Sequence, residues 1–112
     1  MSAQKIALLT LTAAATAANT QHRFVGFDGA PAAAAGNALG VGVVDAEIGD
    51  DFGVDVLGTT VVEAGGAIAD GGAIEVGADA KAVAQSAGVT VARALQEAAA
   101  DGDLIEVLLI AN

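Results

Sequence analysis

Short segments of the chain alternate between apolar and polar residues with a period of two. Residues 51–56 read Asp-Phe-Gly-Val-Asp-Val, so the apolar side chains lie on one face of an extended segment and the polar ones on the other. Ile74 and Val76 flank Glu75 in the same way. This period is typical of a half-buried strand and not of a helix, so both segments are predicted to be β-strands.

Two segments near the end of the chain depart from this alternation. Residues 104–110 are apolar on both faces apart from Glu106, which predicts a strand buried on both sides, in a core or at a subunit contact. Residues 91–100 are rich in Ala, Leu, Gln and Glu, which are good helix formers. We therefore expect a strand that continues into a short helical turn near residues 92–100.

Turn-forming residues recur along the whole chain. Gly, Asn, Asp and Pro favour turns, and turns at intervals of about 8 to 15 residues are typical of all-β proteins. We therefore predict a mainly β fold, a small barrel-like or sandwich-like domain. The predicted turns are Asp28–Pro31, Gly36–Asn37, Gly49–Asp50, Gly65–Gly66, Asp70–Gly72 and Asp101–Asp103.

The two halves of the sequence resemble each other. The matching segments are residues 25–28 with 76–79 at an offset of 51, residues 45–46 with 97–98 at 52, and residues 49–50 with 102–103 at 53. The same register continued towards the N-terminus sets Asn19 against Asp70. This pattern predicts two copies of one β unit, with halves at roughly residues 1–58 and 59–112.

The N-terminal segment allows two interpretations. Residues 5–18 begin with a lysine, continue with an apolar run and contain small residues in an Ala-x-Ala spacing, as a secretory leader does. Three threonines interrupt the apolar run, and threonine suits a strand better than the core of a leader. We favour an extended N-terminal arm or strand, residues 1–20, ahead of a single β-rich domain at residues 21–112.

Composition narrows the possible partners. The chain is 54% hydrophobic but only 3% aromatic, so its core consists of small side chains, each of which buries little area. We therefore expect neighbouring subunits to contribute to stability, as in an oligomer. The formal net charge of −10 repels phosphate backbones and anionic lipids, so we expect neither a nucleic-acid partner nor a membrane. Without cysteine there is no disulfide or thiolate metal site.

The residues that could carry chemistry are few. His22 is the only histidine, too little for a zinc site, and a catalytic triad would have to recruit a distant serine. Asp50 and Asp51, like residues 101–103, lack the spacing of a calcium loop and are interpreted as solvated turns. The glycine-rich residues 36–42 lack the order of a nucleotide-binding loop. We expect no catalytic residue, no metal and no cofactor; an enzyme would need His22 beside an acidic residue in a concave pocket.

Several glycine and valine patterns together resemble a known family. They are residues Ile6–Thr12, Arg23–Gly29, Gly36–Val41, Gly88–Leu95 and Gly102–Val107. With them the chain resembles the phage capsid cement proteins of the DUF2190 group, which are similar in size and role to the head decoration protein of phage lambda. The resemblance covers most of the chain. It implies a β-rich domain on the outer surface of the virion, commonly a trimer, that braces the capsid against internal DNA pressure.

The resemblance also implies the partners, namely the major capsid protein and further copies of the chain in a homotrimer. Its mechanism would be adhesion, because a protein that bridges adjacent capsid subunits makes many weak contacts that act together. An extended N-terminal strand can add its backbone hydrogen bonds to a sheet edge of the shell. The candidate capsid-binding residues are Lys5, Ile6, Leu8, Leu9 and Leu11, with Arg23 as a partner for capsid carboxylates. The alternative is a secreted or surface-displayed β-rich adhesion module with a cleaved leader.

Overall fold

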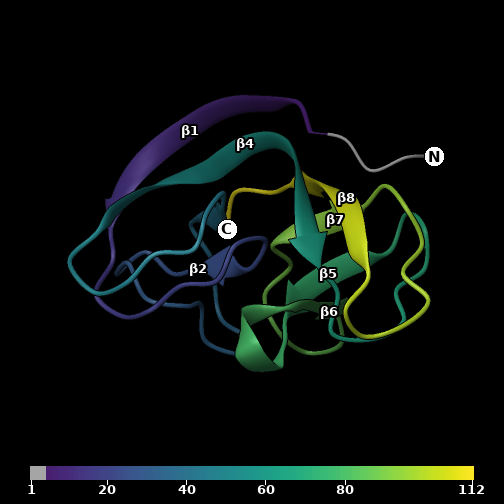
Figure 1. The fold of residues 1–112 in the computed structure, drawn as a ribbon. Helices are drawn as coiled ribbons and strands as arrows, with labels where there is room; N and C mark the ends of the chain where they lie inside the picture. Colours follow the sequence, from purple (N-terminus) through teal and green to yellow (C-terminus); the bar gives the residue numbers. More distant parts are fainter. Residues whose placement is uncertain (1–4) are drawn as a thin grey trace.

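Strands dominate residues 5–112, which are the residues that the computed structural model describes (Figure 1). The mainly β fold predicted from the sequence is confirmed, and the strands form a nearly closed, barrel-like sheet. All the predicted turns are confirmed as turns or bends. The elements are β1 (Ala7–Ala14), β2 (Phe24–Val25), β3 (Gly40–Gly42), β4 (Asp51–Glu63), β5 (Ala73–Val76), the 3-10 turn η1 (Ala78–Ala80), β6 (Ala82–Ala84), β7 (Ala92–Ala94) and β8 (Leu104–Leu109).

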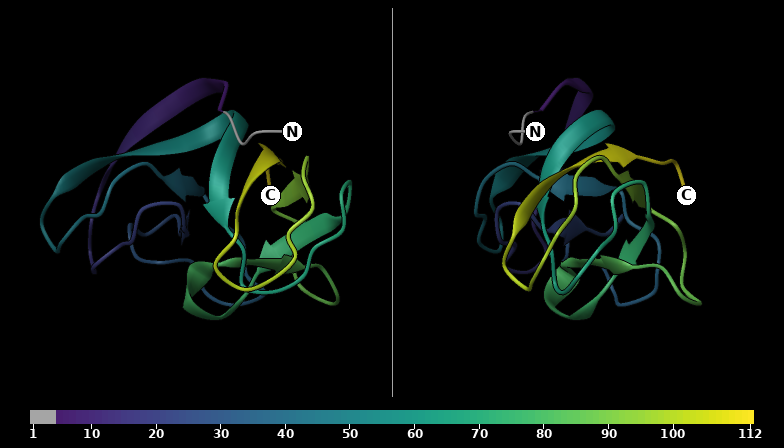
Figure 2. Two further views of the ribbon diagram at one scale, coloured as in Figure 1. Left: turned by 45° about the vertical axis from the view of Figure 1, so that its right-hand side comes forward. Right: turned by 90° about the vertical axis from the view of Figure 1, so that its right-hand side faces the viewer.

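β4 is the longest strand and belongs to both halves of the sheet. Its first part, residues 51–58, pairs with β1, and its second part, residues 59–63, pairs with β8. The order of neighbours is therefore β1–β4–β3–β2 in the first half and β4–β8–β7–β5 in the second. Figure 2 shows β1 along the outside of β4 in both views, while the rest of the second half lies beyond the bend in β4.

Backbone hydrogen bonds repeat between the two halves. Asn19 and Ala46 exchange two of them, at 2.8 and 3.0 Å, and Ile68 and Ala98 exchange the same two at 3.0 and 2.9 Å. The offset from Ala46 to Ala98 is the expected 52, but Asn19 corresponds to Ile68 and not to Asp70. The expected register is wrong before β2 because β5 is two residues longer than β2. The repeated bonds support the proposal of two related β units.

Small apolar side chains fill the interior, as the composition predicted. The main core combines most buried residues of the second half with a few from the first, among them Phe24 and Val41, which are 1% and 0% exposed. A separate, smaller cluster belongs entirely to the first half. It consists of Ala15, Val25, Ala46, Phe52 and Val54.

One prediction about the second half is wrong, and another is confirmed only in part. Residues 92–94 form β7, and the following residues bend towards the bridge between Ala98 and Ile68, so no helical turn lies near residues 92–100. Pairing with β5 and β8 overrides the helix propensity of this segment; the 3-10 turn is η1 instead. In β8 the successive residues Ile105, Glu106 and Val107 are buried, so both faces of the strand are covered there, whereas Leu104 and Leu108 are 49% and 43% exposed. Burial of these two leucines at a subunit contact stays a prediction.

Candidate functional site

Several large apolar side chains lie exposed along β1 and the adjoining part of β4. Leu8 is 71% exposed, and Leu9 lies opposite Leu57 across the two strands, with both side chains about half exposed. Shifts of register between Ala7 and Thr10 interrupt the simple alternation of faces here. We call this surface the apolar ribbon. Its residues are Ile6, Leu8, Leu9, Leu11 and Leu57.

β1 lies at an edge of the sheet. Within the described residues its only strand partner is β4, and the opposite side of β1 faces away from the sheet (Figure 1). A strand edge offers unpaired backbone N–H and C=O groups to another strand. The apolar ribbon therefore combines a free backbone edge with exposed apolar side chains, which are the two features used when one protein adds a strand to another.

A buried carboxylate holds the ribbon to the rest of the sheet. The side chain of Asp55 is fully buried and accepts hydrogen bonds from the hydroxyls of Thr10 and Thr60, at 2.7 and 2.8 Å. The ammonium group of Lys5 lies 2.9 Å from the same carboxylate. Burial alone would raise the pKa of Asp55, but these hydrogen bonds and the charge of Lys5 outweigh it and lower the pKa. Asp55 therefore stays ionised and joins β1, β4 and the segment before β1.

The backbone of Ile6 is fixed as well. Its N–H donates to the hydroxyl of Thr59 at 2.8 Å, and its carbonyl accepts from the N–H of Thr59 at 3.0 Å. Next to Thr59, Gly58 has a φ of +93°, and a Cβ added there would lie 2.5 Å from the Ile6 carbonyl oxygen. Only glycine fits this position, where β4 bends between its two parts.

The structure does not bring together all the residues predicted to bind the capsid. The four apolar ones lie along the ribbon, and Lys5 is at its start, although its ammonium group is engaged with Asp55. Arg23 lies elsewhere, before β2, where its Nε is 3.2 Å from the carboxylate of Glu63. The capsid contact of these six residues stays a prediction, and for Arg23 it would require leaving Glu63.

The residues considered for chemistry have structural roles. His22 adopts a left-handed φ of 65°, and its backbone N–H and C=O bond to Gly42 and Glu63. The carboxylate of Asp50 accepts from the N–H of Glu47, and that of Asp103 from two N–H groups of its own turn. Among residues 5–112 no group of three His, Cys, Asp or Glu residues could hold a metal ion. In the same range, no helix has the length and apolarity to span a bilayer.

Two buried carboxylates were missed by the sequence patterns. The alternation in residues 51–56 predicted that the side chain of Asp55 faces solvent. The alternation in residues 74–76 predicted the same for the side chain of Glu75. Glu75 is only 8% exposed, and its carboxylate accepts from the backbone N–H of Ser86 and of Gly88. The Ser86 bond in particular lowers the pKa of Glu75 in spite of its burial. Both carboxylates bind partners distant in sequence, which no local pattern reveals.

With this geometry established, the comparisons identify the class of protein. The sequence matches the family model described as phage cement protein over residues 3–109, so the chain belongs to the phage cement protein family. This family is one of phage structural proteins, and the resemblance to capsid cement proteins drawn from the sequence is confirmed. The DUF2190 subgroup stays a prediction. No match was found among curated proteins.

A solved structure shares the fold. The N base of the head fiber gp8.5 of bacteriophage phi29 superposes with a TM-score of 0.76 at 23% sequence identity. The match covers 91% of this chain and 93% of the phi29 chain. The two proteins therefore have the same fold over nearly their whole lengths, and the phi29 protein is by its description part of a phage head fiber.

Proposed function

We propose that this protein binds the outer surface of a phage head and stabilises the shell by bridging neighbouring capsid subunits through the apolar ribbon. Membership of the phage cement protein family supports a structural role in the phage particle, and the related fold of a head fiber base is consistent with a position on the head. The single observation that carries the contact surface is the ribbon, where large apolar side chains lie exposed beside a free strand edge.

Charge supports an adhesive role that is restricted to particular surfaces. The chain has a formal net charge of −10, and three of its four cations form ion pairs within the chain. The acidic surface therefore repels other copies and other acidic proteins except where apolar contacts are available. The ribbon provides such contacts, so binding occurs there and is not general. The role we propose is adhesive and not catalytic.

The alternative of an exported adhesion module with a cleaved leader fits the fold less well. The segment that resembles a leader contains β1, so cleavage would remove an edge strand of the sheet. It would also leave the buried Asp55 without Thr10 and Lys5. For the same reason, deleting the segment would be a poor test of capsid binding, because the fold itself would change. Substitution of exposed side chains is the sharper test.

The test compares two equally exposed apolar residues. Leu8 on the ribbon and Ile48 in a loop are both 71% exposed, so neither substitution to glutamine disturbs the core. Purified expanded heads that lack the protein are mixed with wild type, Leu8→Gln or Ile48→Gln, and head occupancy is measured by sedimentation. We expect Leu8→Gln to reduce affinity by about tenfold or more and Ile48→Gln to leave it unchanged.

Each outcome tests a different part of the proposal. If wild type does not bind heads, the proposed function is wrong; if Leu8→Gln binds normally, the ribbon is not the contact. Bridging is tested by heating filled heads with and without bound protein, and an unchanged temperature of DNA release contradicts stabilisation. The trimer implied by the resemblance is also a proposal, checked by sedimentation equilibrium as a mass three times the 10.7 kDa of the chain.

A further inference from the structure

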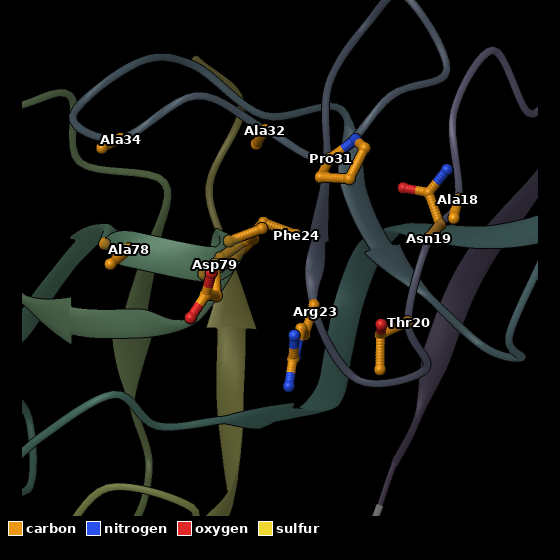
Figure 3. A pocket seen from close by; sticks show the side chains of 12 residues that line it. Ala18, Asn19, Thr20, Arg23, Phe24, Pro31, Ala32, Ala34, Ala78 and Asp79 are labelled. Atoms are coloured by element: carbon orange, nitrogen blue, oxygen red, sulfur yellow. The ribbon is translucent and has the colours of Figure 1, made fainter.

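The two halves of the chain meet at two places whose polar side chains are arranged differently. At one, a cavity of about 300 Å³ lies between the segment before β2 and the turn η1 (Figure 3). Its polar side chains do not converge, because Asp79 and Arg23 both point away from Asn19 in Figure 3. At the other, the bend of β4 at Gly58, three side chains converge on the buried carboxylate of Asp55. The polar groups at the bend can therefore act together.

Residues 5–9 form a separate part of the N-terminal segment and lie across this bend. The pairing of β1 with β4 is regular over residues 10–14, but its register shifts twice between Ala7 and Thr10. Such shifts interrupt the ladder of hydrogen bonds locally. Residues 5–9 can therefore move without the rest of β1. We call these five residues the strap.

Apolar packing contributes little to holding the strap in place. Ile6, Leu8 and Leu9 are 61%, 71% and 46% exposed, and no residue of the strap belongs to either core cluster. Because stabilisation by apolar contact scales with the area removed from water, these side chains add little of it. Polar contacts therefore supply most of the free energy that keeps the strap docked.

Two polar contacts anchor the strap to β4. The backbone of Ile6 exchanges two hydrogen bonds with Thr59, at 2.8 and 3.0 Å. The ammonium group of Lys5 lies 2.9 Å from the carboxylate of Asp55, whose side chain is fully buried. A buried charge that loses its partner is strongly disfavoured. The ion pair therefore couples the position of the strap to the charge of Asp55.

Lys5 is the charged group among the described residues that faces Asp55. From β1 the carboxylate meets the hydroxyl of Thr10, from the second part of β4 that of Thr60, and the β3 residue opposite Asp55 is Val41. A hydroxyl can rotate to donate or to accept, whereas an ammonium group can only donate. Loss of the charge on Asp55 therefore weakens the contact with Lys5 most and leaves residues 10–14 paired.

We propose that the strap docks across the bend of β4 while Asp55 is ionised, and that it opens as a unit when this charge is lost. Docked, the strap sets Leu9 beside Leu57 and completes the ribbon. Opened, it removes Ile6, Leu8 and Leu9 from the ribbon, so heads are bound more weakly. This last step rests on the proposed function, whereas the opening itself does not.

The opening is tested by amide hydrogen exchange of the full chain, followed by ¹⁵N NMR at neutral pH. The N–H groups of Ile6 and Thr59 report on the strap, and that of Ala15, which donates to the carbonyl of Asp50, reports on the rest of the N-terminal segment. Asp55→Asn removes the charge at nearly unchanged size. We expect Ile6 and Thr59 to exchange about tenfold faster or more in this variant, and Ala15 to keep its protection.

Variants of the lysine separate charge from shape. Lys5→Gln should raise exchange at the two strap reporters as Asp55→Asn does, whereas Lys5→Arg, which keeps the charge, should preserve their protection. The matched control Lys81→Gln removes the ion pairs with Glu63 and Asp101 and should leave both reporters unchanged.

A pH profile tests the same charge in the wild type. Burial raises the pKa of Asp55, but the hydrogen bonds from Lys5, Thr10 and Thr60 and the charge of Lys5 outweigh it and lower the pKa. The strap should therefore stay docked above the ordinary pKa of about 3.9 and open as the pH falls through the lowered value. Protection at Ile6 and Thr59, corrected for the intrinsic exchange rate, should show this step in wild type and not in Asp55→Asn.

The outcomes distinguish the strap from the proposed function. The proposal is overturned if Asp55→Asn leaves Ile6 and Thr59 protected, or if Ala15 loses protection together with them. Because the side chain of Asp55 is buried and cannot touch a head, weaker head occupancy by Asp55→Asn would support the link between strap and ribbon. Normal occupancy with an open strap would contradict that link. If wild type does not bind heads, the proposed function is wrong, and exchange alone decides whether the strap opens.

Discussion

The two halves of this protein share one order of strands but treat their apolar side chains differently. The second half supplies most of the main core and leaves three large apolar residues exposed, Val89, Leu104 and Leu108. Among residues 5–58, the first half has one small cluster of its own and leaves eight large apolar residues exposed. These are Ile6, Leu8, Leu9, Leu11, Phe27, Val44, Ile48 and Leu57.

This difference indicates a division of labour between similar units. The main core, which takes most of its residues from the second half, stabilises the fold, while β1 and the first part of β4 leave large apolar side chains exposed. What holds the ribbon in place is largely polar, since Asp55 links Thr10, Thr60 and Lys5 below it. The predictions below test this contrast between the main core and the exposed ribbon.

The largest loss of stability is expected in the main core. Ile74→Ala removes a fully buried side chain and should lower the free energy of unfolding by about 2–5 kcal/mol. Leu8→Ala, on the exposed ribbon, should change it by less than about 0.5 kcal/mol. Urea unfolding followed by circular dichroism measures both. Equal losses would mean that the ribbon is part of the core, and the contrast between the halves would be wrong.

The next largest effect is expected at the junction of the halves. Gly58→Ala forces an unfavourable left-handed residue and also sets its Cβ against the Ile6 carbonyl. Gly49 has a similar φ, +89°, but nothing lies within 4 Å of its added Cβ, so Gly49→Ala isolates the backbone strain at about 1–2 kcal/mol. Gly58→Ala should lose more than this control in urea unfolding. An equal loss would show that the contact with Ile6 does not matter.

Below this comes the polar link beneath the ribbon. Asp55→Asn removes the charge that Lys5 pairs with and should cost about 1–2 kcal/mol near neutral pH. Because the folded pKa of Asp55 is lowered, its stabilisation is present above the unfolded pKa of about 3.9 and is lost as the pH falls through the folded value. Wild type should therefore lose more stability below about pH 4 than Asp55→Asn does. Parallel pH profiles from thermal unfolding would contradict this account.

The smallest effect is expected where ion pairs connect the halves. Glu63 receives both Arg23 of the first half and Lys81 of the second, at 3.2 and 3.3 Å, near the surface. Glu63→Gln should shift the unfolding midpoint less than Asp55→Asn does, and added salt should reduce the effect of Glu63→Gln in part, because these ion pairs are only partly buried and keep some contact with solvent. Persistence of the full effect at 1 M salt, where screening acts over about 3 Å, would contradict a screened pair.

Strands and turns could be predicted from the sequence because their causes are local. The alternation in residues 51–56 and the recurrent glycines and aspartates specify extended segments and their ends without reference to other parts of the chain. The prediction of a helical turn near residues 92–100 was wrong because it relied on local helix propensity alone. The structure of this segment is decided by the pairing of β7 with the distant strands β5 and β8. The capsid contact predicted for Ile6, Leu8, Leu9 and Leu11 stays a prediction, although all four side chains are exposed.

The buried polar groups could not be predicted in this way. Asp55 meets Thr10 across 45 residues of sequence, and a period-two pattern can only assign Asp55 to a polar face. Asn19 and Ile68 lie in opposite halves, and their correspondence emerges only when their backbone hydrogen bonds are compared. Such sites depend on which strands become neighbours, and that information is spread over the whole chain.

The continuity of β4 has a mechanical consequence. A pull on the outer edge of β1 passes through its ladder to the first part of β4 and then along the covalent chain into the second part. There the force acts along five successive residue pairs between β4 and β8, from Thr59–Leu108 to Glu63–Leu104. These pairs share the force at the same time and do not bear it one after another. Tension applied to the outer edge of β1 is therefore transmitted directly to the paired residues of β4 and β8.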